Sequence, residues 1–181
     1  MGFGTGAACA IQLNSSLTQA EKELYQNRTV IQDILQNTRT IAMIGLSTER
    51  QKASYFVATY LLAAGYTVIP VNPKADAILG QTSYPDLRSV PVSIDLVDVF
   101  RPAADCLQIV QEAITCRARA IWFQLKVIPF SAAALAREAG LATVMDLCVK
   151  MEHGRYHGGL HAAGMNTEII SAKRAQPQGR L

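Results

Sequence analysis

The stretch TIAMIGLSTERQKASYFVATYLLAAGYTVIPVNPKA, residues 40–75, decides the fold. Its apolar run over 41–44 is short and uninterrupted, which is typical of a strand buried on both faces. Gly45 ends the run with a residue that can turn sharply, and the segment 54–64 predicts a helix. A second buried strand is predicted over 67–71. The stretch therefore predicts a βαβ unit, which presents a helix N-terminus to a phosphate group.

A basic turn follows the second predicted strand. An NAD-binding unit has Asp or Glu there to accept hydrogen bonds from the ribose, whereas this chain has Asn72, Pro73 and Lys74. Lys74 beside the ribose would attract a phosphate on it, and both NADP and coenzyme A carry such a phosphate. Asp76 keeps a plain NAD site open. The alternative is a simple polar turn, because Asn and Pro form turns in any case.

The loop after Gly45 lacks the second and third glycines of a dinucleotide fingerprint. Its polar residues could instead offer hydroxyls or positive charge to a phosphate: Ser47, Thr48, Arg50 and Lys52. Ser54 is predicted to be the N-cap of the helix that follows. The alternative is that these residues only cap the helix and solubilise the loop. A strand before the loop, a helix after it and two cations between them favour anion binding.

The composition indicates one compact globular domain. Half of the 181 residues are apolar and the net charge is +3, which gives no reason to expect nucleic acid as a partner. No apolar run reaches the ~18 residues that a membrane span needs, so no membrane contact is expected. We expect a flexible segment over 1–15, one domain over 16–174 and a frayed tail over 175–181. A cytoplasmic location is the default expectation, because the N-terminus has no basic region and too short an apolar stretch for a signal peptide. Reduced thiols are expected because the four cysteines form no CxxC pair: Cys9, Cys106, Cys116 and Cys148.

The rest of the chain continues the alternation of strands and helices. Strands are predicted over 94–100, 120–125 and 141–145, and helices over 16–36, 103–116 and 130–139. Within these helices, Leu24 and Leu107 are expected to face the core. Such an order indicates an α/β protein with a Rossmann-like, doubly wound parallel sheet of five strands, helices on both faces and an additional N-terminal helix.

Ligands of such sheets bind beyond the carboxyl ends of the strands. Besides the two turns already described, these ends include Phe100-Arg101-Pro102 and Gln124. Phe100 and Pro102 could pack on a purine while Arg101 binds a phosphate. The alternative is that Phe100 belongs to the core and Arg101 is solvated.

Six segments together resemble the small single-domain CoA-binding proteins, which are similar to the CoA-binding domain of the succinyl-CoA ligase alpha subunit. These segments are IAMIGLS (41–47), VIPVNPKA (68–75), ILGQTSYPDL (78–87), IDLVDVFRPA (94–103), AIWFQL (120–125) and MDLCVKMEH (145–153). The resemblance implies a Rossmann-like fold that holds coenzyme A. It implies adenosine near Asn72-Pro73-Lys74 and Phe100-Arg101-Pro102, and pyrophosphate near Gly45, Ser47 and Ser54. The loop over 49–53 departs from the sequence common in that family.

No catalytic constellation stands out in the sequence. His153, His157 and His161 recur at intervals of four, but the glycines among them argue against a helix, so no metal site is expected. Cys148 could form a mixed disulfide with the coenzyme thiol, or it could be a buried apolar residue. The favoured hypothesis is a non-catalytic protein that binds coenzyme A or an acyl-CoA, with a possible protein partner or homo-oligomer. The alternative is an NADP-dependent oxidoreductase of unknown substrate.

Overall fold

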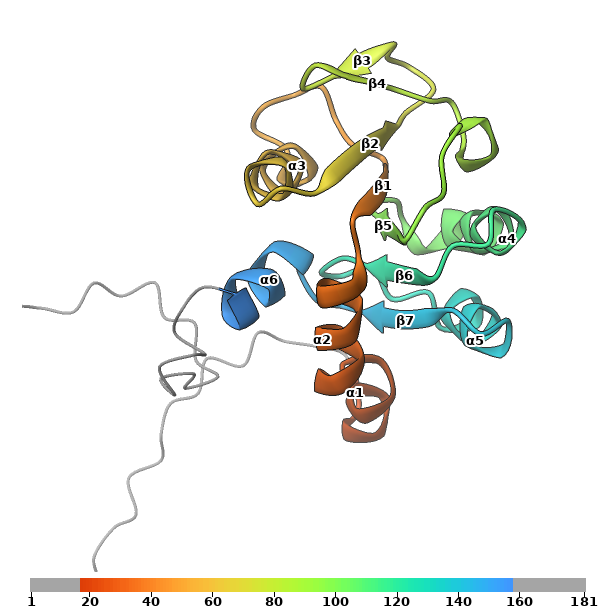
Figure 1. The fold of residues 1–181 in the computed structure, drawn as a ribbon. Coiled ribbons are helices and arrows are strands. Elements are labelled where there is room, and N and C mark those ends of the chain that lie inside the picture. The colour runs from red at the N-terminus through yellow and green to blue at the C-terminus, as the bar shows by residue number, and fades with distance from the viewer. Residues whose placement is uncertain (1–16, 158–181) are drawn as a thin grey trace, which may run out of the picture.

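The structure is a computed structural model and describes residues 17–157 (Figure 1). The segments expected to be flexible or frayed, 1–15 and 175–181, lie outside the described residues. Within 17–157, no helix is both long enough and apolar enough to cross a membrane.

Five parallel strands form the central sheet, as the sequence predicted. They are β1 (Thr40–Ile44), β2 (Thr67–Val71), β5 (Leu96–Val99), β6 (Ala120–Phe123) and β7 (Ala142–Met145). Their spatial order is β2-β1-β5-β6-β7, so the order reverses between β1 and β5. In doubly wound sheets a ligand binds at such a switch point, outside the carboxyl ends of the strands.

Helices cover both faces of the sheet (Figure 1). On one face lie α2 (Arg28–Asn37), α3 (Ala53–Ala63) and α6 (Val149–His157), and on the other lie α4 (Cys106–Thr115) and α5 (Phe130–Glu138). The side chains of β5 and β6 are all buried, because each strand is covered from both sides. Met43 of β1 and Trp122 of β6 fill the core beneath α2, α3 and α6, where both are completely buried.

The predicted leading helix over 16–36 is two helices, α1 (Gln19–Tyr25) and α2, so that prediction was wrong. Asn27 interrupts it, because its side-chain oxygen accepts from the backbone N–H groups of Thr29 and Val30 and so starts a new helix. The neighbouring Gln26 donates to the backbone oxygen of Met145 at 3.1 Å, which ties the break to the end of β7.

Several short elements and two leucines also differ from the expectations. A hairpin of β3 (Ala77–Ile78) and β4 (Gln81–Thr82) lies between β2 and β5; two-residue strands are too short to show a period. Two short 3-10 helices, η1 (Leu87–Ser89) and η2 (Ala103–Asp105), precede β5 and α4. Leu24 and Leu107 are 42% and 46% exposed, so neither faces the core as expected.

A helix also forms where glycine was expected to prevent one. α6 runs through Gly154, whose Cβ position would lie 3.6 Å from the Tyr60 hydroxyl of α3. A glycine costs a helix only about 1 kcal/mol, and packing against a neighbouring helix can outweigh that cost. His153 and His157 therefore lie on one helix, while His161 lies outside the described residues.

Candidate functional site

The turn after β1 lies against the turn after β5, at the switch point of the sheet. Gly45 has a φ of +80°, a conformation that other residues rarely adopt. A Cβ on Gly45 would lie 3.0 Å from Cδ of Arg101 and 3.2 Å from the backbone oxygen of Phe100. Only glycine therefore fits this position without displacing the Phe100-Arg101 turn.

Asn72 joins the glycine turn to the basic turn. Its amide nitrogen donates to the backbone oxygen of Leu46 at 2.8 Å, and its amide oxygen accepts from the backbone N–H of Lys74 at 2.9 Å. The Asn72 backbone N–H donates to the oxygen of Tyr84 at 2.8 Å, which anchors the same turn to the segment after β4. One side chain thus places two of the predicted site segments next to each other.

Ser54 is not the N-cap of α3, which corrects the sequence prediction. That position belongs to Lys52, whose side chain makes no capping bond. Ser54 is buried instead, and its hydroxyl oxygen accepts from the backbone N–H of Ser47 at 3.1 Å. Ser47 in turn accepts from the N–H of Glu49 at 3.0 Å. Hydrogen bonds within the loop therefore stabilise its conformation. The side chain of the N-cap residue, Lys52, leaves the first backbone N–H groups of α3 uncapped.

Arg101 is held by an acidic neighbour. Its Nε and its terminal nitrogen lie 2.9 and 2.7 Å from Oδ2 of Asp105, and both side chains are about half exposed. Phe100 packs partly buried against the core on the α3 side, whereas Pro102 is exposed. The aliphatic part of Arg101 thus lies beside Gly45, while Asp105 holds the guanidinium and balances part of its charge.

A buried polar pair lies below the end of β6. Gln124 is 4% exposed and its amide nitrogen donates to Oδ1 of Asp98 at 2.7 Å. Asp98 is completely buried in β5, and this burial raises the pKa of its carboxyl group to about 7, against a lowering effect of the Gln124 bond. Among the described residues, Oδ2 of Asp98 has no hydrogen-bond partner. The sequence reasoning passed over Asp98, although an acid inside the apolar strand LVDV was a visible signal.

The two described histidines form a stacked pair on α6. The rings of His153 and His157 lie 4.4 Å apart at an angle of 8°, and Nδ1 of His153 lies 3.0 Å from the Tyr60 hydroxyl. Burial, and then the neighbouring His157, lower the pKa of His153. No group of three potential metal ligands occurs within residues 17–157.

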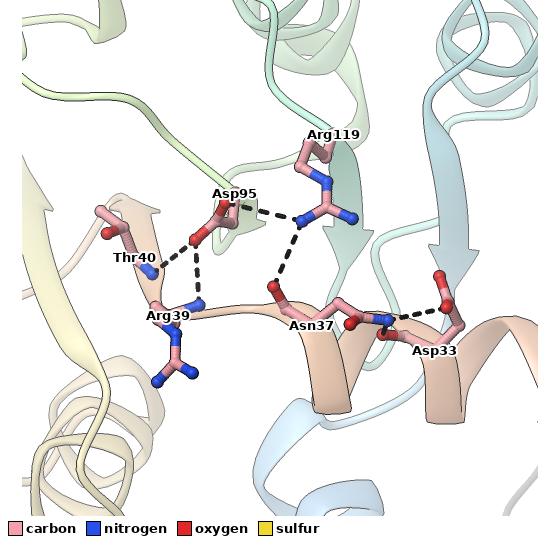
Figure 2. Close-up of polar contacts among 6 residues, drawn as sticks. All are labelled: Asp33, Asn37, Arg39, Thr40, Asp95 and Arg119. Carbon is pink, nitrogen blue, oxygen red and sulfur yellow. Dashed lines mark hydrogen bonds and ion pairs between the residues drawn. The ribbon is translucent and has the colours of Figure 1, made fainter.

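The opposite edge of the sheet carries a different polar cluster (Figure 2). Oδ2 of Asp95 accepts from the backbone N–H groups of Arg39 and Thr40 at 2.9 and 3.0 Å, and Arg119 reaches the backbone oxygen of Asn37 at 3.3 Å. A cavity of about 60 Å³ lies beside them, and none of the predicted site residues lines it. The contacts hold the end of α2 and the start of β1, which indicates a structural role.

All of the predicted site residues follow carboxyl ends of strands, and the parallel sheet brings these ends to one edge. The loop after β1 and the start of α3 supply Gly45, Ser47, Thr48, Arg50, Lys52 and Ser54. The turns after β2, β5 and β6 supply Asn72, Pro73, Lys74, Phe100, Arg101, Pro102 and Gln124. Thr48, Arg50, Lys52 and Lys74 are exposed, so their polar groups are accessible to a ligand at this edge.

Several known proteins are similar to this chain in sequence and fold. A family model described as "CoA binding domain" matches residues 39–154. The uncharacterised protein YneT of Bacillus subtilis is 33% identical over 127 residues, which cover 70% of this chain and 94% of YneT. Among solved structures, a hypothetical protein from Pyrococcus horikoshii is 32% identical, with a TM-score of 0.69 and coverage of 83% of this chain and 98% of that one.

A second solved structure, that of Prb, a protein redesigned for binding, is 37% identical with a TM-score of 0.71. The match covers 72% of this chain and 92% of Prb. The family match spans all five strands of the sheet and both turns that Asn72 connects. The chain therefore belongs to the CoA-binding domain family.

Proposed function

We propose that the protein binds coenzyme A, or an acyl-CoA, without transforming it. The observation that carries the proposal is the bridge made by Asn72, which connects the glycine turn before α3 to the turn that bears Lys74. A pyrophosphate at the start of α3 would meet helix N–H groups and the favourable end of the helix dipole. The adenosine ribose, which adjoins the pyrophosphate in coenzyme A, would then lie beside Lys74.

The charges at this edge support a ligand with several phosphates. Lys74, Arg50 and Lys52 are all exposed, and within residues 17–157 the one ion pair found among them joins Lys52 to Glu49, with 3.9 Å between nitrogen and oxygen. An exposed pair of this kind contributes at most about 1 kcal/mol, so Lys52 remains available to an anion. Coenzyme A carries a pyrophosphate and a ribose phosphate, which suits two separate basic positions.

The polar side chains at the strand ends support binding rather than catalysis. Asn72 and Ser54 are committed to backbone atoms of the loop, and Oδ1 of Asp146 accepts from the N–H of Lys126 at 2.8 Å. Such side chains shape a cradle for a ligand. They are not arranged as a base beside a nucleophile, which covalent catalysis would require.

Thermal unfolding with four ligands tests the proposal. Coenzyme A, dephospho-coenzyme A, NADP and NAD are each added in large excess to the full chain. A ligand at 100 times its dissociation constant adds about 2.7 kcal/mol to the unfolding free energy, which is visible as a higher Tm. We expect the largest shift with coenzyme A. A shift with NADP instead would contradict the proposal and favour an oxidoreductase.

Charge reversal locates the ribose phosphate. We expect Lys74→Glu to weaken coenzyme A more than dephospho-coenzyme A, because only the former carries that phosphate. Arg88→Glu is the matched control, since Arg88 is an exposed cation of η1 and lies away from the carboxyl ends of the strands. Equal losses for the two ligands would remove Lys74 from this role.

A further inference from the structure

Cys148 directly precedes α6, in the turn that follows β7. It lies between β7 and α6, is partly buried, and packs against the apolar core under α6. Burial raises the pKa of the Cys148 thiol, and the nearby backbone N–H groups of Met151 and Lys150 offset only part of this rise. A thiol in the capping position of a helix is therefore present at the same edge of the sheet as the candidate ligand site.

The thiol of a bound coenzyme could reach Cys148. α6 and α3 pack against the same face of the sheet and touch each other, and both begin at the carboxyl edge. From β1 to β7 there are three strand spacings, roughly 14 Å in total. The pantetheine arm is a diamide chain about as long as four to five extended residues, roughly 15 Å. An arm that starts at the glycine turn thus spans the distance to the end of β7.

A second observation at this place points to a ligand. Asp98 lies in register with Met43 and Trp122, so its side chain faces the layer that contains α6, and its charge is close enough to raise the pKa of Cys148. Its Oδ2 is buried without a partner among the described residues. Buried carboxylate oxygens normally have a donor. An amide N–H or a thiol of a pantetheine arm beside Cys148 would supply one.

Hydrogen bonds hold the backbone of the turn that precedes Cys148. The indole nitrogen of Trp122 donates to the backbone oxygen of Leu147 at 2.7 Å, and Asp146, with a φ of +58°, accepts from the N–H of Lys126. The thiol is thus presented by a braced turn. By contrast, Cys106 is fully buried with a pKa raised to about 11, and Cys116 follows α4 at the opposite edge of the sheet.

We propose that Cys148 undergoes thiol–disulfide exchange with a disulfide of coenzyme A held in the site. The Cys148 thiolate attacks the coenzyme sulfur, the disulfide bond of the ligand breaks, and a bond forms between Cys148 and coenzyme A. The second thiol leaves as a thiolate and takes up the proton that Cys148 released, so the ligand disulfide is the only oxidant required. This inference rests on the proposed function and adds a covalent state of the same site.

Intact-mass measurement with peptide mapping tests the exchange. The reduced full chain is mixed with coenzyme A disulfide or, separately, with glutathione disulfide. Because binding raises the local concentration of the ligand, we expect Cys148 to react at least about tenfold faster with the coenzyme disulfide. Cys148→Ser should abolish this adduct, and Cys116→Ser should leave it unchanged. Lys74→Glu should slow the reaction with coenzyme A disulfide but not with glutathione disulfide.

The outcomes separate this inference from the binding proposal. A Tm shift with reduced coenzyme A but no adduct on Cys148 would overturn the exchange and leave the binding function standing. Equal rates for the two disulfides, or an adduct mainly on another cysteine, would also overturn it, because no selectivity for the bound coenzyme would remain. Asp98→Asn provides an independent readout, since removal of this charge should lower the pKa of Cys148 and shift the pH profile of the exchange to lower pH.

Discussion

Replacement of Asp98 by Asn should remove a large part of the pH dependence of stability. Asp98 is completely buried, and its pKa of about 7 in the folded protein lies far above the usual value of 3.8. Between these two pKa values the folded state therefore keeps a proton that the unfolded state releases. Asn has nearly the same shape, carries no charge, and retains an oxygen that can accept from Gln124.

The sign and size of the effect follow from proton linkage. A group whose pKa is raised on folding stabilises the protein fully below its unfolded pKa, and this stability is lost as the pH rises through about 7. For the stated pKa values, the free energy of unfolding should fall by about 2 to 3 kcal/mol between about pH 5 and pH 8. Asp98→Asn should lack this fall, so the variant should gain stability relative to the parent as the pH rises.

Urea denaturation of both proteins at several pH values measures the difference. Other titrating groups contribute equally to parent and variant, so they cancel in the comparison. Asp86→Asn is the control, because hydrogen bonds from Ser89 lower the pKa of Asp86 and place its titration below this pH range. A difference between parent and Asp98→Asn that is constant from about pH 5 to pH 8 would refute the reasoning, since Asp98 would then not titrate there.

Three further substitutions test the structure. Gly45→Ala should destabilise the protein by about 1–3 kcal/mol in urea denaturation, because of the positive φ and the 3.0 Å approach of Arg101; an unchanged stability would contradict this geometry. Asn27→Ala should cost about 1 kcal/mol, because α2 loses its cap, and the same measurement checks it against Asn37→Ala at the other end of α2. His153→Gln should reduce the loss of Tm on acidification: a His whose pKa is lowered on folding supports stability above its usual pKa of 6.5 and loses it below, and an unaltered acid slope would exclude His153 as the cause.

The βαβ unit was predictable because its pattern is local. The strands over 41–44 and 67–71 are continuous apolar runs, and they are found as β1 and β2 within one residue. The break at Asn27 was not predicted, because the capping bonds of Asn27 compete with a helical pattern that runs through it. α6 was missed for the opposite reason, since contacts with α3 stabilise a segment whose own glycine disfavours a helix.

The candidate site was predictable only as a set of strand ends. Topology placed the turns at one edge, but the pairing of Asp98 with Gln124 depends on the register of β5 beside β6, which the sequence does not display. The role of Ser54 was also misjudged. A serine near the start of a helix suggests an N-cap. Here the loop instead brings the backbone N–H of Ser47 to the Ser54 hydroxyl oxygen, which accepts from it.

Asn72 shows why an acid at position 72 would disturb the connection between the two turns. An aspartate at position 72 would keep an acceptor for the N–H of Lys74, but it could not donate to the backbone oxygen of Leu46, which lies 2.8 Å from the amide nitrogen. A carboxylate oxygen would instead face a carbonyl oxygen across that distance, and the glycine turn would have to move. The amide at position 72 that connects the two turns therefore cannot be replaced by a ribose-binding carboxylate without a rearrangement of the glycine turn. An acid at position 72 should therefore destabilise the glycine turn, and Asn72→Asp should lower the Tm of the protein even without a ligand.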